Sequence, residues 1–170
     1  MLRVRRRPGA NRSAGLLFAA GKVYPCRLGR SGIAAVKREG DGTTPTGSYR
    51  LLYGFFRGDR LRKPQTALTL RAIRPEDGWC DEPAHPAYNR QVRLPFAASH
   101  ERMWRDDALY DICIVLDHNF TRRARNRGSA VFFHLTAEKP YTAGCIAIDR
   151  AIMEKLLPLL SERTRMVIEL

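Results

Sequence analysis

Short apolar or alternating runs recur along the chain, and residues typical of turns separate them. This spacing predicts many short strands rather than a helical protein. The runs that predict strands are 16–19, 23–28, 33–37, 48–56, 66–73, 112–116, 131–135, 145–148 and 166–170. Many strands with few helices are typical of a mainly β sandwich or closed barrel of mixed strand direction.

One helix is expected near the end of the chain. Asp149 is a good N-cap residue, and Ile152, Leu156 and Leu160 follow at a spacing that lines one helical face. Pro158 should shorten or kink this helix, because proline lacks the backbone N–H that a helix interior requires. We therefore expect one C-terminal helix that ends close to Pro158.

The stretch 74–99 carries four prolines and predicts a long irregular excursion, followed by a short helix over 100–104. We expect one domain over 1–170, because a chain of 170 residues can bury its own core. The segment 1–13 is rich in arginine and is expected to be a flexible basic arm.

The net charge of +13 indicates attraction to anions such as nucleic acid, anionic lipid or an acidic polymer. It does not choose among them. The Arg-rich run 122–127 has no accompanying recognition motif, so we interpret it as a solvated loop and expect no nucleic-acid partner. No run of eighteen apolar residues predicts a membrane span, and no convincing export signal follows the basic start.

Cysteine and histidine stand together in one segment, 134–148. His134 ends one apolar run and Cys145 begins another, eleven residues later. If the two runs form neighbouring strands, imidazole and sulfur meet across the loop and can share a proton, which would hold a thiolate. Gly144 allows a close backbone approach, and the amides of Gly144 and Cys145 could receive an oxyanion. The residues alone favour a buried core cysteine over a catalytic one.

Other chemistry is weakly supported. The four cysteines show no close pairing, so we expect free thiols. Two Cys-x4-His pairs, one beginning at Cys80 and one at Cys113, have a spacing that zinc accepts, but Cys113 lies in an apolar run and we expect no metal and no cofactor. In the Gly-rich run 40–47, Asp41 is interpreted as a cap of local turn amides rather than as part of a phosphate cradle.

Taken together, Gly-Asp-Gly-Thr-Thr-Pro-Thr-Gly (40–47), the upstream Lys37, His134 and Thr-Ala-Gly-Cys-Ile (142–146) resemble the L,D-transpeptidase catalytic domain, the YkuD family. The resemblance covers about 16–170 and implies a mainly β domain around a Cys–His site. It departs from the family motif at two positions: Ala143 stands where a second histidine is usual, and Ala147 stands where arginine or asparagine is usual.

The resemblance implies acyl transfer on peptidoglycan stem peptides or muropeptides. Cys145 would attack the carbonyl at the L-centre of meso-diaminopimelate or of another stem residue, His134 would carry the proton, and an amine would resolve the thioester. The alternatives are a cytoplasmic L,D-carboxypeptidase of muropeptide recycling and a non-enzymatic binding module for peptidoglycan or nucleic acid. The reaction class implies the periplasm or cell wall, whereas the missing export signal implies the cytoplasm. The sequence does not specify the oligomeric state.

Substrate contacts are expected from polar residues on the long excursion and from the turn beside the nucleophile. Arginine binds carboxylates bidentately, and stem peptides carry several carboxylates. The residues assigned to substrate binding are Tyr88, Asn89, Arg90, Arg93 and Thr142. For the residues on the excursion, a solvated polar loop is an equally open alternative.

Overall fold

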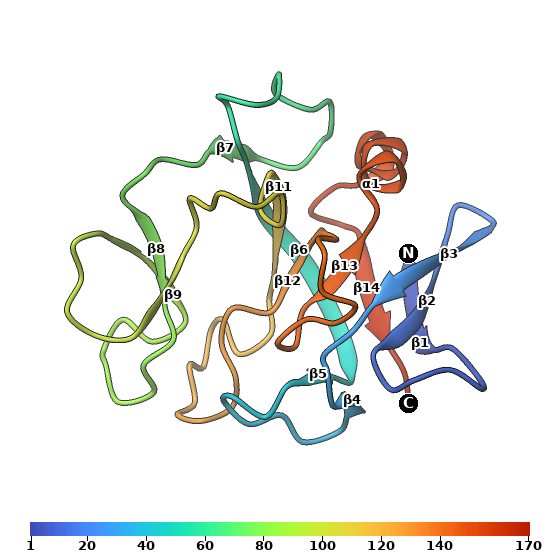
Figure 1. Cartoon of the computed structure of the whole chain (residues 1–170), viewed down its shortest axis with the longest axis horizontal. Helices are drawn as coiled ribbons and strands as arrows, with labels where there is room; N and C mark the ends of the chain where they lie inside the picture. The colour runs from blue at the N-terminus through green and yellow to red at the C-terminus, as the bar shows by residue number, and fades with distance from the viewer.

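A computed structural model describes residues 1–170 and is mainly β, as the run lengths predict (Figure 1). The chain forms fourteen strands, with one helix and one 3-10 turn near the C-terminus. In chain order the elements are β1 (Leu2–Arg6), β2 (Ala14–Ala19), β3 (Lys22–Arg27), β4 (Gly32–Ala34), β5 (Thr43–Pro45), β6 (Gly47–Phe56), β7 (Leu70–Ala72), β8 (Asp77–Cys80), β9 (Arg90–Arg93), β10 (His100–Arg102), β11 (Ile112–Leu116), β12 (Phe132–Leu135), β13 (Ile146–Ile148), α1 (Arg150–Leu156), η1 (Leu157–Leu159) and β14 (Arg165–Ile168).

The main sheet closes into a barrel of mixed strand direction. Its order is β11-β12-β13-β3-β2-β1-β14-β6-β7, and a further pairing of β11 with β6 closes the ring. The long strand β6 makes this closure, since its first half pairs with β14 and its second half pairs with β11. The pairs β12–β13 and β1–β14 are parallel, whereas most of the others are antiparallel.

The C-terminal helix follows its sequence signals. Asp149 Oδ1 accepts a hydrogen bond from the amide of Ala151 at 2.8 Å, which is the predicted N-cap. The helix ends at Leu156, and Pro158 lies in the 3-10 turn that follows, so the predicted shortening is confirmed. This helix is seven residues long, and no helix of the protein could cross a membrane.

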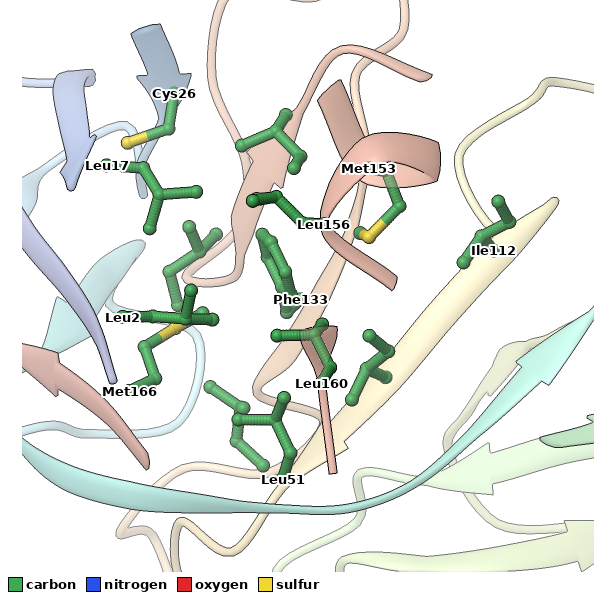
Figure 2. Packing of buried hydrophobic residues seen from close by; sticks show 14 of the residues in the cluster. Leu2, Leu17, Cys26, Leu51, Ile112, Phe133, Met153, Leu156, Leu160 and Met166 are labelled. Carbon is green, nitrogen blue, oxygen red and sulfur yellow. The ribbon is translucent and has the colours of Figure 1, made fainter. Parts of the chain in front are cut away.

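A large aliphatic core fills the barrel and contains 24 buried residues. Figure 2 shows Phe133 of β12 packed near Leu156 and Leu160, with Met153 of α1 close by. Burying a side chain of this size stabilises the fold by roughly 1.5–3 kcal/mol. The core therefore fixes one face of β12 against the helix and leaves its other face for a second cluster.

That second cluster of nine buried residues lies on the opposite face of β11 and β12. It joins Phe132, Cys113 and Cys145 to Trp79 of β8, whose ring meets Phe132 edge-on at 5.0 Å between centroids. Figure 1 shows β8 and β9 on the side of β11 and β12 away from α1. The second cluster thus attaches a small three-stranded sheet to the barrel.

Three expectations need correction. The excursion 74–99 is not wholly irregular, because β8 pairs with β9 and with β10 in a three-stranded sheet. The stretch 100–104 is not a helix, since β10 begins there. The expected flexible arm contains β1, in which alternating Leu2 and Val4 are buried and the backbone pairs with β14 from the other end of the chain. Its arginines alternate with these buried residues, so charge concealed the strand pattern.

Candidate active site

Cys145 lies immediately before β13, beside β12. The parallel register pairs Phe133 with Ile146, so Cys145 falls next to Phe132. Its Sγ accepts a hydrogen bond from the Phe132 amide at 3.3 Å and donates one to the carbonyl of Ala130 at 3.0 Å. The side chain is largely buried, yet it lines a cavity of about 290 Å³. A small molecule that enters this cavity meets the thiol on its wall.

His134 lies on β12 on the same sheet face as Cys145, two residues beyond Phe132, which is level with Cys145. The predicted neighbouring strands are therefore observed. No hydrogen bond joins the two side chains, because the thiol is bonded to Ala130 instead. The imidazole Nδ1 lies 2.8 Å from the Leu135 carbonyl, which can only accept. Nδ1 is therefore the protonated nitrogen, and Nε2 is left with a free lone pair that can take a proton.

Burial sets the charge state of both groups. It raises the pKa of the Cys145 thiol to about 12, an effect that Glu101 increases and that the Phe132 amide and Lys37 oppose. Burial lowers the pKa of His134 to about 4, partly offset by its hydrogen bond to Leu135. A neutral thiol and a neutral imidazole therefore coexist near pH 7, whereas the sequence suggested a stored thiolate.

The turn before the nucleophile is held by two threonines. Thr142 Oγ1 donates to the Cys145 carbonyl at 2.7 Å and accepts from the Gly144 amide at 3.1 Å. Thr44 Oγ1 adds a longer contact to the same carbonyl at 3.4 Å. The Gly144 amide is therefore occupied, whereas the Cys145 amide donates to no acceptor in the chain. Of the two amides expected to receive an oxyanion, that of Cys145 is the free one.

Gly144 is required at its position by both conformation and space. Its φ of +151° lies in the region that favours glycine. A Cβ there would lie 2.8 Å from the Thr43 carbonyl oxygen and 3.3 Å from Lys37 Nζ. The absence of a side chain lets the turn approach the Gly-rich loop and brings the Lys37 ammonium close to the nucleophile.

Lys37 also belongs to the site. The sequence analysis named it only as part of the family motif and gave it no role. Its side chain is 5% exposed, it lines the cavity, and its Nζ donates to Asp41 Oδ1 at 2.5 Å and to the Arg38 carbonyl at 3.0 Å. Asp41 also accepts from the amides of Arg38 and Thr43, which confirms its capping role. Burial works to raise the pKa of Asp41, but the hydrogen bonds from Lys37 and these two amides dominate and lower it to about 2. The result is a neutralised ion pair beside the thiol.

Three carboxylates also line the cavity, from Glu39, Asp81 and Glu101. Glu101 accepts from the Tyr110 hydroxyl at 2.7 Å, and burial, together with the charges of Asp81 and Glu39, raises its pKa. Asp81 Oδ1 is buried without a hydrogen-bond partner. These acids come from three separate segments, and no sequence spacing links them, so sequence reasoning did not find them.

Tyr88 and Asn89 are buried and bonded within the protein. The Tyr88 hydroxyl donates to Glu39, and Asn89 Oδ1 accepts from Trp79 Nε1 at 3.0 Å and from the Ala130 amide at 3.1 Å. Neither side chain lines the cavity at Cys145. Their contacts fix the segment around Ala130, whose carbonyl holds the nucleophile.

Arg90 and Arg93 also lie away from the cavity lining. The Arg90 guanidinium stacks over the Phe120 ring at 4.2 Å and donates to the Phe120 carbonyl at 2.6 Å. Arg93 is exposed beside Glu76, at 3.4 Å. Thr142 is buried and shapes the turn described above. The structure thus places Cys145 and Gly144 on the cavity wall and His134 on the adjacent strand, and none of the five expected substrate residues lines the cavity.

The two alanines that depart from the motif have different surroundings. Ala143 is exposed and lines the cavity, whereas Ala147 is buried in β13 directly opposite His134. All four cysteines are free, as the sequence predicts. No three His, Cys, Asp or Glu side chains come close enough to hold a metal ion.

Comparison with known proteins gives one family. The family model for the L,D-transpeptidase catalytic domain, YkuD, matches residues 11–168, nearly the whole chain. A search of curated proteins finds no match.

Proposed function

Because the chain belongs to the YkuD family of L,D-transpeptidase catalytic domains, we propose that it transfers the acyl group of a peptidoglycan stem peptide through a thioester at Cys145. The observation that carries this proposal is that Cys145 and His134 lie on one sheet face of adjacent parallel strands, with the thiol on the wall of a cavity. A thiol, a base and an oxyanion donor within one small volume are the parts that acyl transfer requires.

In the acylation step, Cys145 Sγ attacks the carbonyl carbon of the stem peptide and its proton passes to His134 Nε2. The Cys145 amide stabilises the oxyanion that develops, since that amide has no other acceptor. Collapse of the tetrahedral intermediate breaks the peptide C–N bond, and His134 returns the proton to the leaving amine. An acyl thioester and a free amino acid or peptide amine result.

In the second step, an acceptor amine attacks the thioester carbonyl and gives its proton to His134. The C–S bond breaks, and the sulfur recovers the proton from the imidazole. The result is a new amide cross-link and a regenerated thiol. Water in place of the amine would give a trimmed peptide, which is the carboxypeptidase alternative with the same residues in the same roles.

Activation in this scheme depends on substrate binding rather than on a stored ion pair. The resting thiol is neutral and donates to the Ala130 carbonyl, and the imidazole is also neutral. Sγ must turn from Ala130 toward Nε2 as the carbonyl approaches. The Lys37 ammonium, whose Nζ would lie 3.3 Å from a Cβ on Gly144, supports the negative charge as it forms.

Mass spectrometry of the products from purified disaccharide-tetrapeptide muropeptides tests the proposal. We expect a cross-linked dimer and one released amino acid per link, with no product from the Cys145→Ala protein. A trimmed tripeptide without a dimer would identify the carboxypeptidase. Unchanged muropeptides that nevertheless bind the protein would contradict catalysis and leave a binding module.

A further inference from the structure

A second cleft adjoins the nucleophile cavity and carries the opposite charge. It has a volume of about 460 Å³ and no hydrophobic lining residue. Glu39 lines both this cleft and the Cys145 cavity, so the two hollows are neighbours. The other residues of the cleft are Arg38, Arg125, Asn126 and Arg127.

The three guanidinium groups of this cleft are not compensated. All three arginines are exposed, and none takes part in an ion pair of the protein. Glu39, the one acid that lines the cleft, already accepts hydrogen bonds from the Tyr88 hydroxyl and from Ser129 Oγ. Three positive charges line one hollow with a single acid and without an ion-pair partner, and this excess of positive charge favours an external anion.

The loop that carries Arg125 and Arg127 is held in place by its own hydrogen bonds. Asn119 Oδ1 accepts from the Ala124 amide at 2.8 Å, and Asn119 Nδ2 donates to the Ala124 and Gly128 carbonyls at 3.0 Å each. The Glu39 amide donates to the Asn126 carbonyl at 3.1 Å, which ties this loop to the strand-connecting segment that carries Arg38. The backbone positions of the arginines are therefore fixed before a ligand arrives, which lowers the entropy that binding costs.

The neighbouring cavity restricts which anion fits. Glu39, Asp81 and Glu101 line it, so a polyanion that continued past the arginines would meet three carboxylates. No Phe, Tyr or Trp lines either hollow, so a nucleobase would find no stacking surface. A ligand that fits both hollows has a compact anionic group for the arginines of the cleft and a neutral or cationic adjacent part for the acids of the cavity.

We propose that Arg38, Arg125 and Arg127 form a subsite that binds a free carboxylate of the peptide whose acyl group reaches Cys145. This inference rests on the proposed function and assigns the carboxylate contact to residues other than Arg90 and Arg93. Guanidinium groups bind carboxylates through paired hydrogen bonds, which would set both the position and the direction of the peptide.

The test compares Arg125→Gln/Arg127→Gln with Arg122→Gln/Arg123→Gln. The control pair removes two positive charges from the same loop but lies outside the cleft. Stem tetrapeptides are used with each carboxylate free or amidated in turn. For one carboxylate we expect the cleft variant to raise KM about tenfold, with kcat changed less than about twofold. Amidation of that carboxylate should raise the KM of the wild type and leave the KM of the cleft variant unchanged.

Binding of the same peptides to the Cys145→Ala protein separates this inference from the proposed function. Calorimetry that shows selective loss of affinity in the cleft variant, without turnover by the wild type, would support the subsite and contradict acyl transfer. Equal losses in both arginine pairs would show a general surface-charge effect and overturn the subsite. If the wild type turns over free and amidated peptides with the same KM, the subsite is also overturned. Tighter binding of a nucleic-acid oligonucleotide than of any peptide would overturn the subsite too.

Discussion

The two faces of β11, β12 and β13 carry different kinds of residue for different purposes. One face is aliphatic and aromatic and packs into the barrel core; its members are Ile112, Ile114, Phe133, Leu135, Ile146 and Ile148. The other face carries sulfur, imidazole and aromatic rings; its members are Cys113, Val115, Phe132, His134 and Cys145. Neighbouring residues of one strand therefore serve stability and chemistry in turn. Burial of the core face fixes the strands, and the fixed strands hold the thiol of Cys145 and the imidazole of His134 in register on the other face.

Cys145→Ala is expected to have the largest effect, and this effect should fall on turnover rather than on stability. Turnover should fall by about 10⁴-fold or more, because no other group replaces the nucleophile. The free energy of unfolding should change little, since only one sulfur atom is removed. Cys113→Ala is the matched control, a buried thiol on the same face that does not line the cavity. Equal loss of turnover in both variants would show that the face acts through packing alone.

Phe133→Ala on the core face is expected to reduce stability. Phe133 is fully buried, so its truncation should lower the free energy of unfolding by about 3–5 kcal/mol, measured by urea denaturation. Val23→Ala on β3, half-exposed, is the control and should change stability by less than about 0.5 kcal/mol. A loss below about 1 kcal/mol for Phe133→Ala would contradict the role given to this face.

A pH effect on stability is expected from His134. Its folded pKa is about 4, whereas an unfolded histidine titrates near 6.5. Between these two pKa values the unfolded chain binds more protons than the folded chain. The free energy of unfolding therefore decreases as the pH is lowered through this range, by about 3 kcal/mol in total. Denaturation at a series of pH values should show this slope in the wild type and a smaller slope in His134→Gln. Identical slopes would contradict a buried neutral imidazole.

The smallest effect is expected from the charge beside the thiol. Lys37 opposes the raised pKa of Cys145, so Lys37→Met should slow alkylation of Cys145 by neutral iodoacetamide, by up to about tenfold. Asp41→Asn removes the counterion of Lys37 and should accelerate alkylation. The two variants therefore move the rate in opposite directions. The same direction for both would show loop disruption rather than electrostatics.

The sequence predicted that Cys145 and His134 lie on neighbouring strands because this signal is local. Cys145 and His134 are close in the chain, and the apolar runs around them place both on one face of adjacent strands. The helix was predicted for the same reason, since Asp149 and Pro158 act on their own neighbours. Tautomer and charge state required the structure, because the Leu135 carbonyl and the depth of burial determine them.

The sequence did not predict features that depend on distant segments. Strand β1 was missed because its arginines conceal the alternation of buried residues, and its pairing with β14 at the other end of the chain is seen only in the fold. The acids of the cavity come from segments around 39, 81 and 101, and only the folded chain brings them together. Arg90 was assigned to substrate by residue type, but its guanidinium stacks on Phe120. The arginines of 122–127 are exposed, as the interpretation of a solvated loop predicts, but the sequence did not show that two of them line the cleft that shares Glu39 with the Cys145 cavity.

The most direct test of the central claim is intact-protein mass spectrometry after brief exposure to a stem tetrapeptide, followed by peptide mapping. The claim predicts a mass increase equal to the acyl part of the peptide, located on Cys145. It also predicts that hydroxylamine removes this adduct, because the bond is a thioester, and that Cys145→Ala never acquires it. An adduct on Cys26, Cys80 or Cys113, or turnover of peptide by the Cys145→Ala protein, would contradict the account.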